Sequence, residues 1–353
     1  MEEHSVNEDW LHFSNVPYDF PSECVLDFFV PYQNKIKEPK EKYPVLICTH
    51  GGGWILKNKN SMLSMAESFM KLQLDEAKKF STEKEKPANF CIIVPSYRLS
   101  SLNSDILAKA VTFQSIVLIS LGTCIPSLLP ITIAVLLVVL LSALVFVASR
   151  RTAMVRHPVH VEDLACLVKW IVRNDGQKGM DASKIVLLGH SAGAHLVTLL
   201  ATNTRYLESF DVDPARIRGV VAMSGVYSDK RLQETSGGQE ILNNVFAQPA
   251  TESEHENIHS DQVNPYRECF PIYHCKASTP PHLLTVSEID FGLKQHAFDY
   301  AYALQQKGVY VDSIVASNNT HFSVHKYWKS KNKHIFEKVR QFSLECLDIS
   351  LPT

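Results

Sequence analysis

The fold of this chain is decided by residues 184–195, KIVLLGHSAGAH. The first half is a run of branched apolar residues, which is typical of a buried parallel strand, and a helical pattern of small and apolar residues follows. Between them Ser191 lies at the apex of a Gly-x-Ser-x-Gly turn, where a side chain at Gly189 or Gly193 would collide with neighbouring backbone. The pattern predicts an exposed Ser191 hydroxyl, with the Ala192 N–H at the start of the next helix.

Strand-like and helix-like segments alternate along the rest of the chain. Short apolar runs predict strands at 25–30, 44–48, 90–94, 217–223, 282–286 and 309–315. Helical periodicity predicts helices at 61–80, with Ser61 as N-cap, at 158–174, at 294–306 and over most of 322–346. The polar residues 228–276 predict a loop-dominated excursion above the sheet. Such alternation is typical of an α/β fold with a mostly parallel sheet and helices on both faces.

Composition and charge exclude several classes of protein. The 353 residues are 45% hydrophobic, enough for a sizeable core, and the net charge of −2 gives no reason to expect nucleic acid as a partner. The eight scattered cysteines lack zinc-site spacing and predict free thiols in a reducing compartment. The acidic N-terminus has no apolar run, so we expect no secretory signal peptide.

A nucleophilic serine needs a base, and the base needs a carboxylate to orient it. Asp290 follows the predicted strand 282–286, and His321 follows the predicted strand 309–315. Both therefore lie at the same edge of the sheet as Ser191, in the chain order serine, acid, histidine. Glu288 remains an alternative for the acid, and His325 remains an alternative for the base.

The segment His50-Gly-Gly-Gly-Trp54 follows another predicted strand. Consecutive glycines leave backbone N–H groups free to approach a ligand. We therefore expect Gly52 and Gly53 to join Ala192 as donors to a developing oxyanion, each worth on the order of 3 kcal/mol in the transition state. A merely flexible loop is the alternative interpretation of this segment.

These motifs carry a family resemblance. The residues concerned are His50–Trp54, Tyr97-Arg98-Leu99, His157-Pro158 through Glu162-Asp163, Gly189–Gly193, Asp290 and His321-Phe322-Ser323. Over residues 25–105 and 150–346 the chain resembles the α/β-hydrolase superfamily, and within it hormone-sensitive-lipase-like carboxylesterases, kynurenine formamidases and prenylcysteine methylesterases. The resemblance implies an α/β-hydrolase fold, an oxyanion hole in the His-Gly-Gly loop, and no metal or cofactor. The chain departs from these relatives at Val286-Ser287-Glu288, where His-Gly is commoner, and by an insert after Leu99.

The insert, residues 106–149, is strongly apolar. Residues 110–149 contain no charged residue and no histidine, and Gly122, Pro126 and Pro130 separate two arms. Each arm matches the roughly 20 residues of a membrane helix, and basic residues flank the pair. The glycine loop precedes the insert and Ser191 follows it, yet the two must meet. A single crossing would place them on opposite sides of a membrane, so the insert crosses the membrane twice or not at all. We predict a transmembrane hairpin, with a re-entrant or interfacial anchor, an apolar cap and a gene-model artefact as alternatives.

The sequence thus predicts a polar N-terminal segment (1–24), a catalytic domain (25–346) interrupted by the insert, and a tail (347–353). We expect a serine esterase that acts on a small-molecule or lipid ester, such as a prenylcysteine methyl ester or an acyl ester. An arylformamidase is the alternative enzyme, and a non-catalytic binding protein is a third hypothesis. The only glycosylation sequon, Asn318-Asn319-Thr320, directly precedes His321. A glycan at this position would block the site. We therefore expect the catalytic domain on the cytoplasmic side of a membrane, for example the endoplasmic reticulum, with a cytoplasmic enzyme as the alternative.

Overall fold

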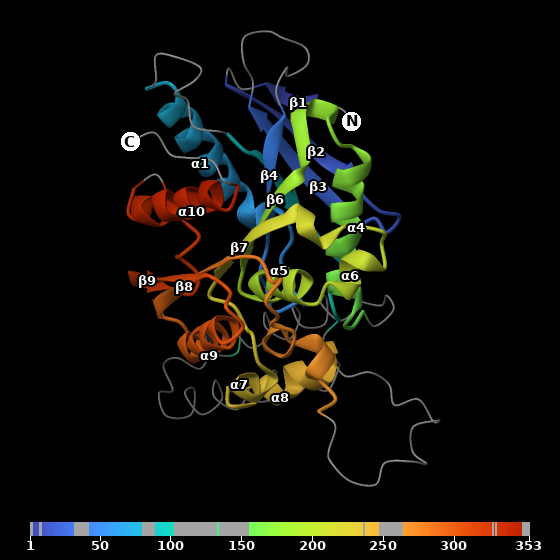
Figure 1. Ribbon diagram of the computed structural model, residues 1–353, viewed down its shortest axis with the longest axis vertical. Coiled ribbons are helices and arrows are strands. Elements are labelled where there is room, and N and C mark those ends of the chain that lie inside the picture. The colour runs from blue at the N-terminus through green and yellow to red at the C-terminus, as the bar shows by residue number, and fades with distance from the viewer. Residues whose placement is uncertain are drawn as a thin grey trace.

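A single mixed sheet organises the computed structural model, which describes residues 3–6, 9–31, 42–79, 89–101, 133, 155–235, 237–246, 264–326, 328 and 330–347. Among these residues nine strands pair in the order β1-β2-β3-β5-β4-β6-β7-β8-β9 (Figure 1). The strands are β1 (Glu3–Val6), β2 (Trp10–Pro17), β3 (Val25–Pro31), β4 (Tyr43–Thr49), β5 (Cys91–Pro95), β6 (Met180–His190), β7 (Ile217–Met223), β8 (His282–Ile289) and β9 (Val311–Thr320). From β5 to β9 all neighbours are parallel, whereas β1, β2, β3 and β5 pair antiparallel. The prediction of a mostly parallel sheet is confirmed.

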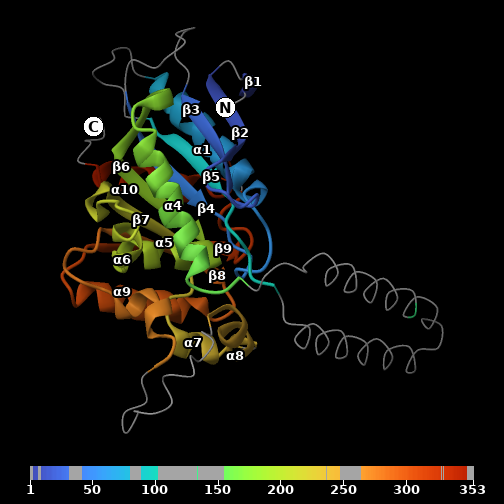
Figure 2. The ribbon, with the colours of Figure 1, turned by 90° about the vertical axis from the view of Figure 1, so that its right-hand side faces the viewer.

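Helices cover both faces of this sheet, as the alternating pattern predicts. In Figure 1, α1 (Asn60–Ala77) and α10 (Lys333–Glu345) lie to one side of the sheet and α4 (Val159–Arg173) lies to the other. Figure 2 shows α4 and α5 (Ala192–Thr202) in front of the strands, with α9 (Leu293–Gln305) below them. The remaining elements are short: α6 (Arg205–Glu208), α7 (Asp229–Gln233), α8 (Gly238–Ile241), η2 (Gln177–Gly179), η3 (Pro214–Arg216), η4 (Leu242–Phe246), η6 (Arg267–Cys269) and η7 (Pro271–Tyr273).

Two apolar clusters hold these layers together. Along β6, Ile185 and Leu187 belong to the cluster that contains α4, α5 and α9. Val186 and Leu188, which point to the opposite face, belong to the cluster that contains α1 and α10. Successive strand side chains point to opposite faces, so an unbroken apolar run is buried on both sides. This is why the sequence of β6 lacks the polar alternation of a half-exposed strand.

The N-terminal segment is part of the sheet and not a separate polar region. Although the sequence sets residues 1–24 apart from the catalytic domain, β1 and β2 extend the sheet by antiparallel pairing on β3. The strand pattern of β2 is obscured because several of its side chains are only half-buried. His12, the third residue of this strand, packs on Phe29 with ring centroids 4.2 Å apart, so this polar side chain is packed within the fold.

Three local predictions are wrong in detail. Ser61 is not the N-cap of α1: the helix begins at Asn60 after Lys59, and the Ser61 hydroxyl donates to the Asn58 carbonyl at 2.9 Å. Among the residues of 322–346 that the structure describes, only those of α10 are helical, because the Asn332 amide donates to the Ser323 and Lys326 carbonyls (3.0 and 2.7 Å) and holds the preceding chain in turns. The excursion 228–276 is not mainly loop where the structure describes it, because it contains α7, α8, η4, η6 and η7; residues 236 and 247–263 lie outside the described residues.

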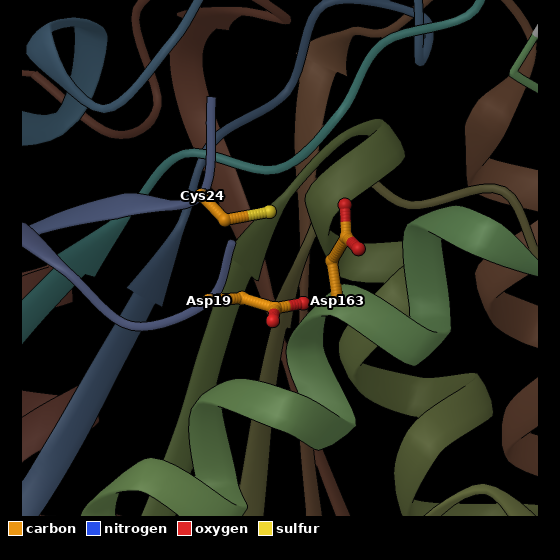
Figure 3. A group of neighbouring side chains, drawn as sticks. All are labelled: Asp19, Cys24 and Asp163. Carbon is orange, nitrogen blue, oxygen red and sulfur yellow. The ribbon is translucent and has the colours of Figure 1, made fainter. Parts of the chain in front are cut away.

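A salt bridge joins the end of β5 to α4. Asp163 accepts hydrogen bonds from the backbone N–H of Arg98 (2.8 Å) and from its guanidinium Nε (3.0 Å). Asp19 and Cys24 lie beside it, and one potential metal-ligand atom from each of these three residues lies within 4.8 Å of the others (Figure 3). Burial and the Asp163 charge raise the pKa of Cys24 to about 12, and the Asp163 carboxylate is already occupied by the Arg98 guanidinium. We interpret the group as a structural salt bridge.

The predicted membrane segment, residues 106–149, lies outside the described residues apart from Ile133, and so does the tail beyond Leu347. Within the part of the chain that the structure describes, no helix combines the length and the apolar character that a membrane span requires.

Candidate active site

Ser191 sits in a strained turn between β6 and α5. Its backbone has φ +56° and ψ −120°, a conformation that is costly for a residue with a side chain. A Cβ on Gly189 would lie 2.3 Å from the Gly193 carbonyl oxygen, and a Cβ on Gly193 would lie 2.4 Å from the Thr49 carbonyl oxygen. The two flanking glycines therefore allow the backbone segments to touch. The Ser191 N–H donates to the Met223 carbonyl at 2.8 Å and so ties the turn to β7.

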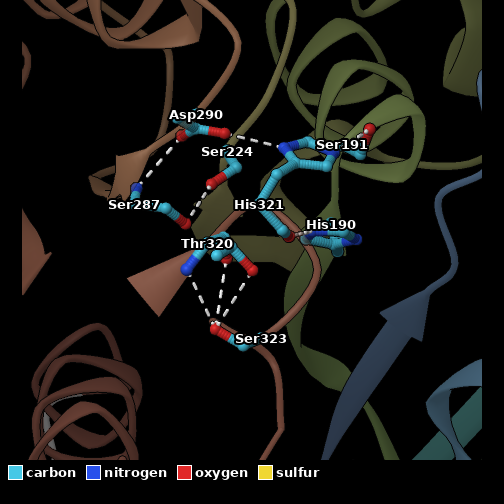
Figure 4. A network of polar contacts seen from close by, with 8 residues as sticks. All are labelled: His190, Ser191, Ser224, Ser287, Asp290, Thr320, His321 and Ser323. Carbon is cyan, nitrogen blue, oxygen red and sulfur yellow. Dashed lines mark hydrogen bonds and ion pairs between the residues drawn. The ribbon is translucent and has the colours of Figure 1, made fainter. Parts of the chain in front are cut away.

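The structure brings Ser191, His321 and Asp290 into one hydrogen-bonded line (Figure 4). The Nε2 atom of His321 lies 3.0 Å from the Ser191 hydroxyl oxygen, and its Nδ1 atom lies 2.7 Å from an Asp290 carboxylate oxygen. The other Asp290 oxygen accepts the Ser287 N–H at 3.0 Å. An ionised carboxylate only accepts hydrogen bonds, so Nδ1 carries the imidazole proton and Nε2 is free to accept the serine proton.

The two alternative residues take other places. Glu288 is exposed, and its carboxylate accepts the Asn318 N–H at 2.6 Å. His325 is buried against His190, with ring centroids 4.2 Å apart. Among the described residues, His321 provides the side-chain hydrogen bond to the Ser191 hydroxyl. Neither Glu288 nor His325 joins that line.

The His190 side chain contacts the backbone of His321, and our sequence analysis did not predict this contact. Its Nε2 atom lies 2.7 Å from the His321 carbonyl oxygen. Burial, with His325 and His321 close by, keeps the pKa of His190 well below its usual range, so the ring is neutral and Nε2 donates. The His321 N–H in turn donates to the Ile289 carbonyl at 2.9 Å. Hydrogen bonds thus fix both the N–H and the carbonyl of His321. The sequence signal that could have identified His190 is its position inside the Gly-His-Ser motif.

The glycine loop passes directly beside Ser191. A Cβ on Gly51 would lie 2.9 Å from the Ser191 Cβ, and Gly52 and Gly53 have φ values of +118° and +61°. His50 begins the loop and stacks on the Tyr97 ring at 4.3 Å. Burial lowers the pKa of His50 to about 4, so the neutral ring donates from Nδ1 to the Gly51 carbonyl at 2.7 Å. These contacts place the loop beside Ser191, where an oxyanion would form. The assignment of Gly52, Gly53 and Ala192 as oxyanion donors stays a prediction.

Trp54 ties the same loop to α5, which the sequence analysis also missed. Its indole N–H donates to Nδ1 of His195 at 3.2 Å, and Nε2 of His195 lies 2.7 Å from the Cys269 carbonyl oxygen. Burial lowers the pKa of His195 to about 4, so the ring is neutral, with one acceptor and one donor nitrogen. The loop is therefore anchored to the helix that begins after Ser191.

A cavity of about 580 Å³ opens over Ser191 and His321. Its wall is mainly apolar, with a polar section where Arg231 of α7 pairs with Asp299 (2.6 Å) and Glu234 (2.9 Å). The lining residues are Gly53, Trp54, Ser191, Val226, Arg231, Leu232, Glu234, Thr235, Ile241, Phe291, Gly292, Leu293, Gln295 and His321. A cavity of this size holds a small organic molecule.

Comparisons with known proteins agree on the fold. The model of a family described as alpha/beta hydrolase fold matches residues 133–325. A probable carboxylic ester hydrolase, LipM, of Mycobacterium tuberculosis (strain ATCC 25618 / H37Rv) is 28% identical over 130 residues, which is 35% of this chain but only 28% of that relative's length.

Solved structures extend the likeness to nearly the whole chain. A truncated carbohydrate esterase from gut microbiota is 13% identical with a TM-score of 0.63, over 98% of this chain and 99% of that one. An esterase of Pyrobaculum calidifontis is 15% identical with a TM-score of 0.58, over 93% and 82%. A bacterial heroin esterase is 17% identical with a TM-score of 0.56, over 95% and 83%. At these identities the likeness shows the fold alone.

Proposed function

Since the chain belongs to the alpha/beta-hydrolase fold family, we propose that it is a serine hydrolase that cleaves a carboxylic ester through an acyl-enzyme intermediate. The observation that carries the proposal is the line Ser191–His321–Asp290, with 3.0 and 2.7 Å between successive side chains. The names of the similar proteins, a probable carboxylic ester hydrolase and several esterases, support an ester as substrate.

In the proposed reaction His321 Nε2 takes the Ser191 proton as the serine oxygen attacks the ester carbonyl carbon. The negative charge that develops on the carbonyl oxygen is stabilised by the N–H groups of Gly52, Gly53 and Ala192. When the tetrahedral intermediate collapses, the carbon–oxygen bond to the alcohol breaks and His321 gives its proton to that oxygen. Water then repeats the sequence on the acyl-enzyme, and Asp290 stabilises the imidazolium in both halves.

The test of function compares an ester with a formamide. We expect the purified protein to react with a fluorophosphonate probe and to hydrolyse short acyl esters with a higher kcat/KM than N-formylkynurenine. N-formylkynurenine is the informative competitor because its formamide carbonyl would meet the same serine and the same N–H donors. Faster turnover of N-formylkynurenine would make the protein an arylformamidase, and absence of both labelling and turnover would favour a binding protein.

We also propose that residues 106–149 tether the enzyme to a membrane, with the catalytic domain on the cytoplasmic side, because so long an apolar stretch would be an aggregation hazard in water. Full-length protein should sediment with membranes and resist carbonate extraction. Replacing residues 110–149 by a short polar linker should release it, keep hydrolysis of small soluble esters and reduce hydrolysis of membrane-embedded ones. Full-length protein that stays monomeric in the detergent-free soluble fraction would show that no tether exists.

A further inference from the structure

Two phenylalanines follow the acid and the histidine directly, and both are exposed. Phe291 is 65% exposed and Phe322 is 53% exposed, although each follows a buried residue, Asp290 or His321. Their ring centroids lie 5.7 Å apart in an edge-to-face arrangement. Single exposed apolar residues are common, whereas an exposed pair of touching rings, one of which (Phe291) lines the cavity, indicates a surface that meets a ligand.

The fold holds Phe291 at this position. Its φ is +47°, and Gly292 after it has φ +83°, so two successive residues adopt left-handed conformations. The turn is closed by the Leu293 N–H, which donates to the Asp290 carbonyl at 2.7 Å. Left-handed φ is unfavourable for a phenylalanine, so the turn holds Phe291 in a strained backbone conformation. Phe291 consequently lines the cavity together with Ser191 and His321.

Both rings contact the imidazole that handles the proton. The centroid of His321 lies 5.7 Å from that of Phe291 and 5.2 Å from that of Phe322. In ester hydrolysis His321 protonates the departing alcohol, whose oxygen must lie within hydrogen-bond reach of Nε2. The alcohol half of the substrate therefore lies on the His321 side of the cavity, where the two rings are.

The charge beside the rings restricts the alcohol further. The Lys57 ammonium lies 5.7 Å from the Phe322 centroid, so one face of that ring already meets a cation. Burial, and after it the neighbouring charge of Lys326, lower the pKa of Lys57. A cationic alcohol such as choline would be repelled here, whereas a neutral ring would pack on the phenylalanine edges.

We propose that Phe291 and Phe322 form the leaving-group subsite of this enzyme, and that it takes esters of neutral, flat, apolar alcohols in preference to small or cationic ones. The proposal rests on the proposed ester hydrolysis and names the half of the substrate that this surface selects. A methyl ester, including that of a prenylcysteine, would leave the subsite empty.

The test keeps the acetyl group constant and varies the alcohol. Methanol and benzyl alcohol have similar acidity, so the ratio of kcat/KM for benzyl acetate to that for methyl acetate reports binding of the alcohol group. We expect wild type to favour benzyl acetate, and Phe291→Ala and Phe322→Ala each to lower the ratio by up to about tenfold, the range of an aromatic contact. Phe298→Ala is the matched control, because Phe298 is 51% exposed on α9 but, unlike Phe291, does not line the cavity and, unlike Phe322, is not among the rings that contact His321 in the described structure.

A second pair of substrates tests the charge. Wild type should prefer 3,3-dimethylbutyl acetate to acetylcholine, its cationic isostere, and Lys57→Gln should shift that ratio toward acetylcholine. Equal losses on benzyl and methyl acetate in the phenylalanine variants, or a loss that follows acyl-chain length in methyl esters, would overturn the subsite while ester hydrolysis stands. Failure of the proposed function is distinct, because wild type would then hydrolyse none of these esters.

Discussion

Replacing Ser191 with alanine is expected to lower kcat by about a million-fold, the cost typical of losing the nucleophile of a serine hydrolase. The His321 Nε2 atom, 3.0 Å from the serine oxygen in the native protein, would then have no hydroxyl to deprotonate. Hydrolysis of a short acyl ester by purified protein measures the loss. Labelling by a fluorophosphonate probe should disappear in parallel, because the probe bonds to the same oxygen.

The Ser191→Ala variant should remain folded. The turn is held by backbone hydrogen bonds to the Met223 carbonyl and from the His195 N–H (2.8 and 3.1 Å), which alanine preserves. Its circular dichroism spectrum and its Tm should therefore match those of wild type closely. More than a small fraction of residual activity in such a folded variant would show that Ser191 is not the nucleophile.

The second large effect separates two neighbouring histidines. His321→Ala should lower kcat about as much as loss of the serine, because nucleophile and base act as a unit. His325→Ala should keep most of the activity, because His325 packs on His190 and is not hydrogen-bonded to Ser191 in the described structure. Measuring kcat for both variants with the same ester gives the comparison.

His325→Ala is expected to be less stable, since it removes a buried side chain. Burial and the charges of Lys57 and Lys326 lower the pKa of His325 to about 3, so the ring is neutral at any working pH and contributes packing. The matched measurement is Tm, which should fall for His325→Ala. If the two variants lost kcat equally while both stayed folded, the assignment of His321 as the base would be untenable.

Elements whose pattern is local could be predicted from the residues alone. The β6–Ser191–α5 turn could be predicted because its glycines meet neighbouring backbone at distances that exclude any side chain. The mostly parallel sheet followed from apolar runs such as 185–188, which can be buried only between two layers of helices. Chain order and strand ends likewise pointed to Asp290 and His321.

Tertiary structure decided what depends on partners far away in the sequence. β1 and β2 carry weak strand patterns, and their place in the sheet comes from pairing with β3. Asp290 rather than Glu288 reaches His321, because the turn after β8 directs the Asp290 carboxylate between the Ser287 N–H and the imidazole.

The contacts that hold His321 and the glycine loop in place also depend on tertiary structure. The His190 ring meets the His321 carbonyl across 131 residues of chain, and the Trp54 indole meets His195 across 141. No periodicity or spacing records such contacts. A buried polar group needs a partner, and only the folded chain determines which partner lies within reach.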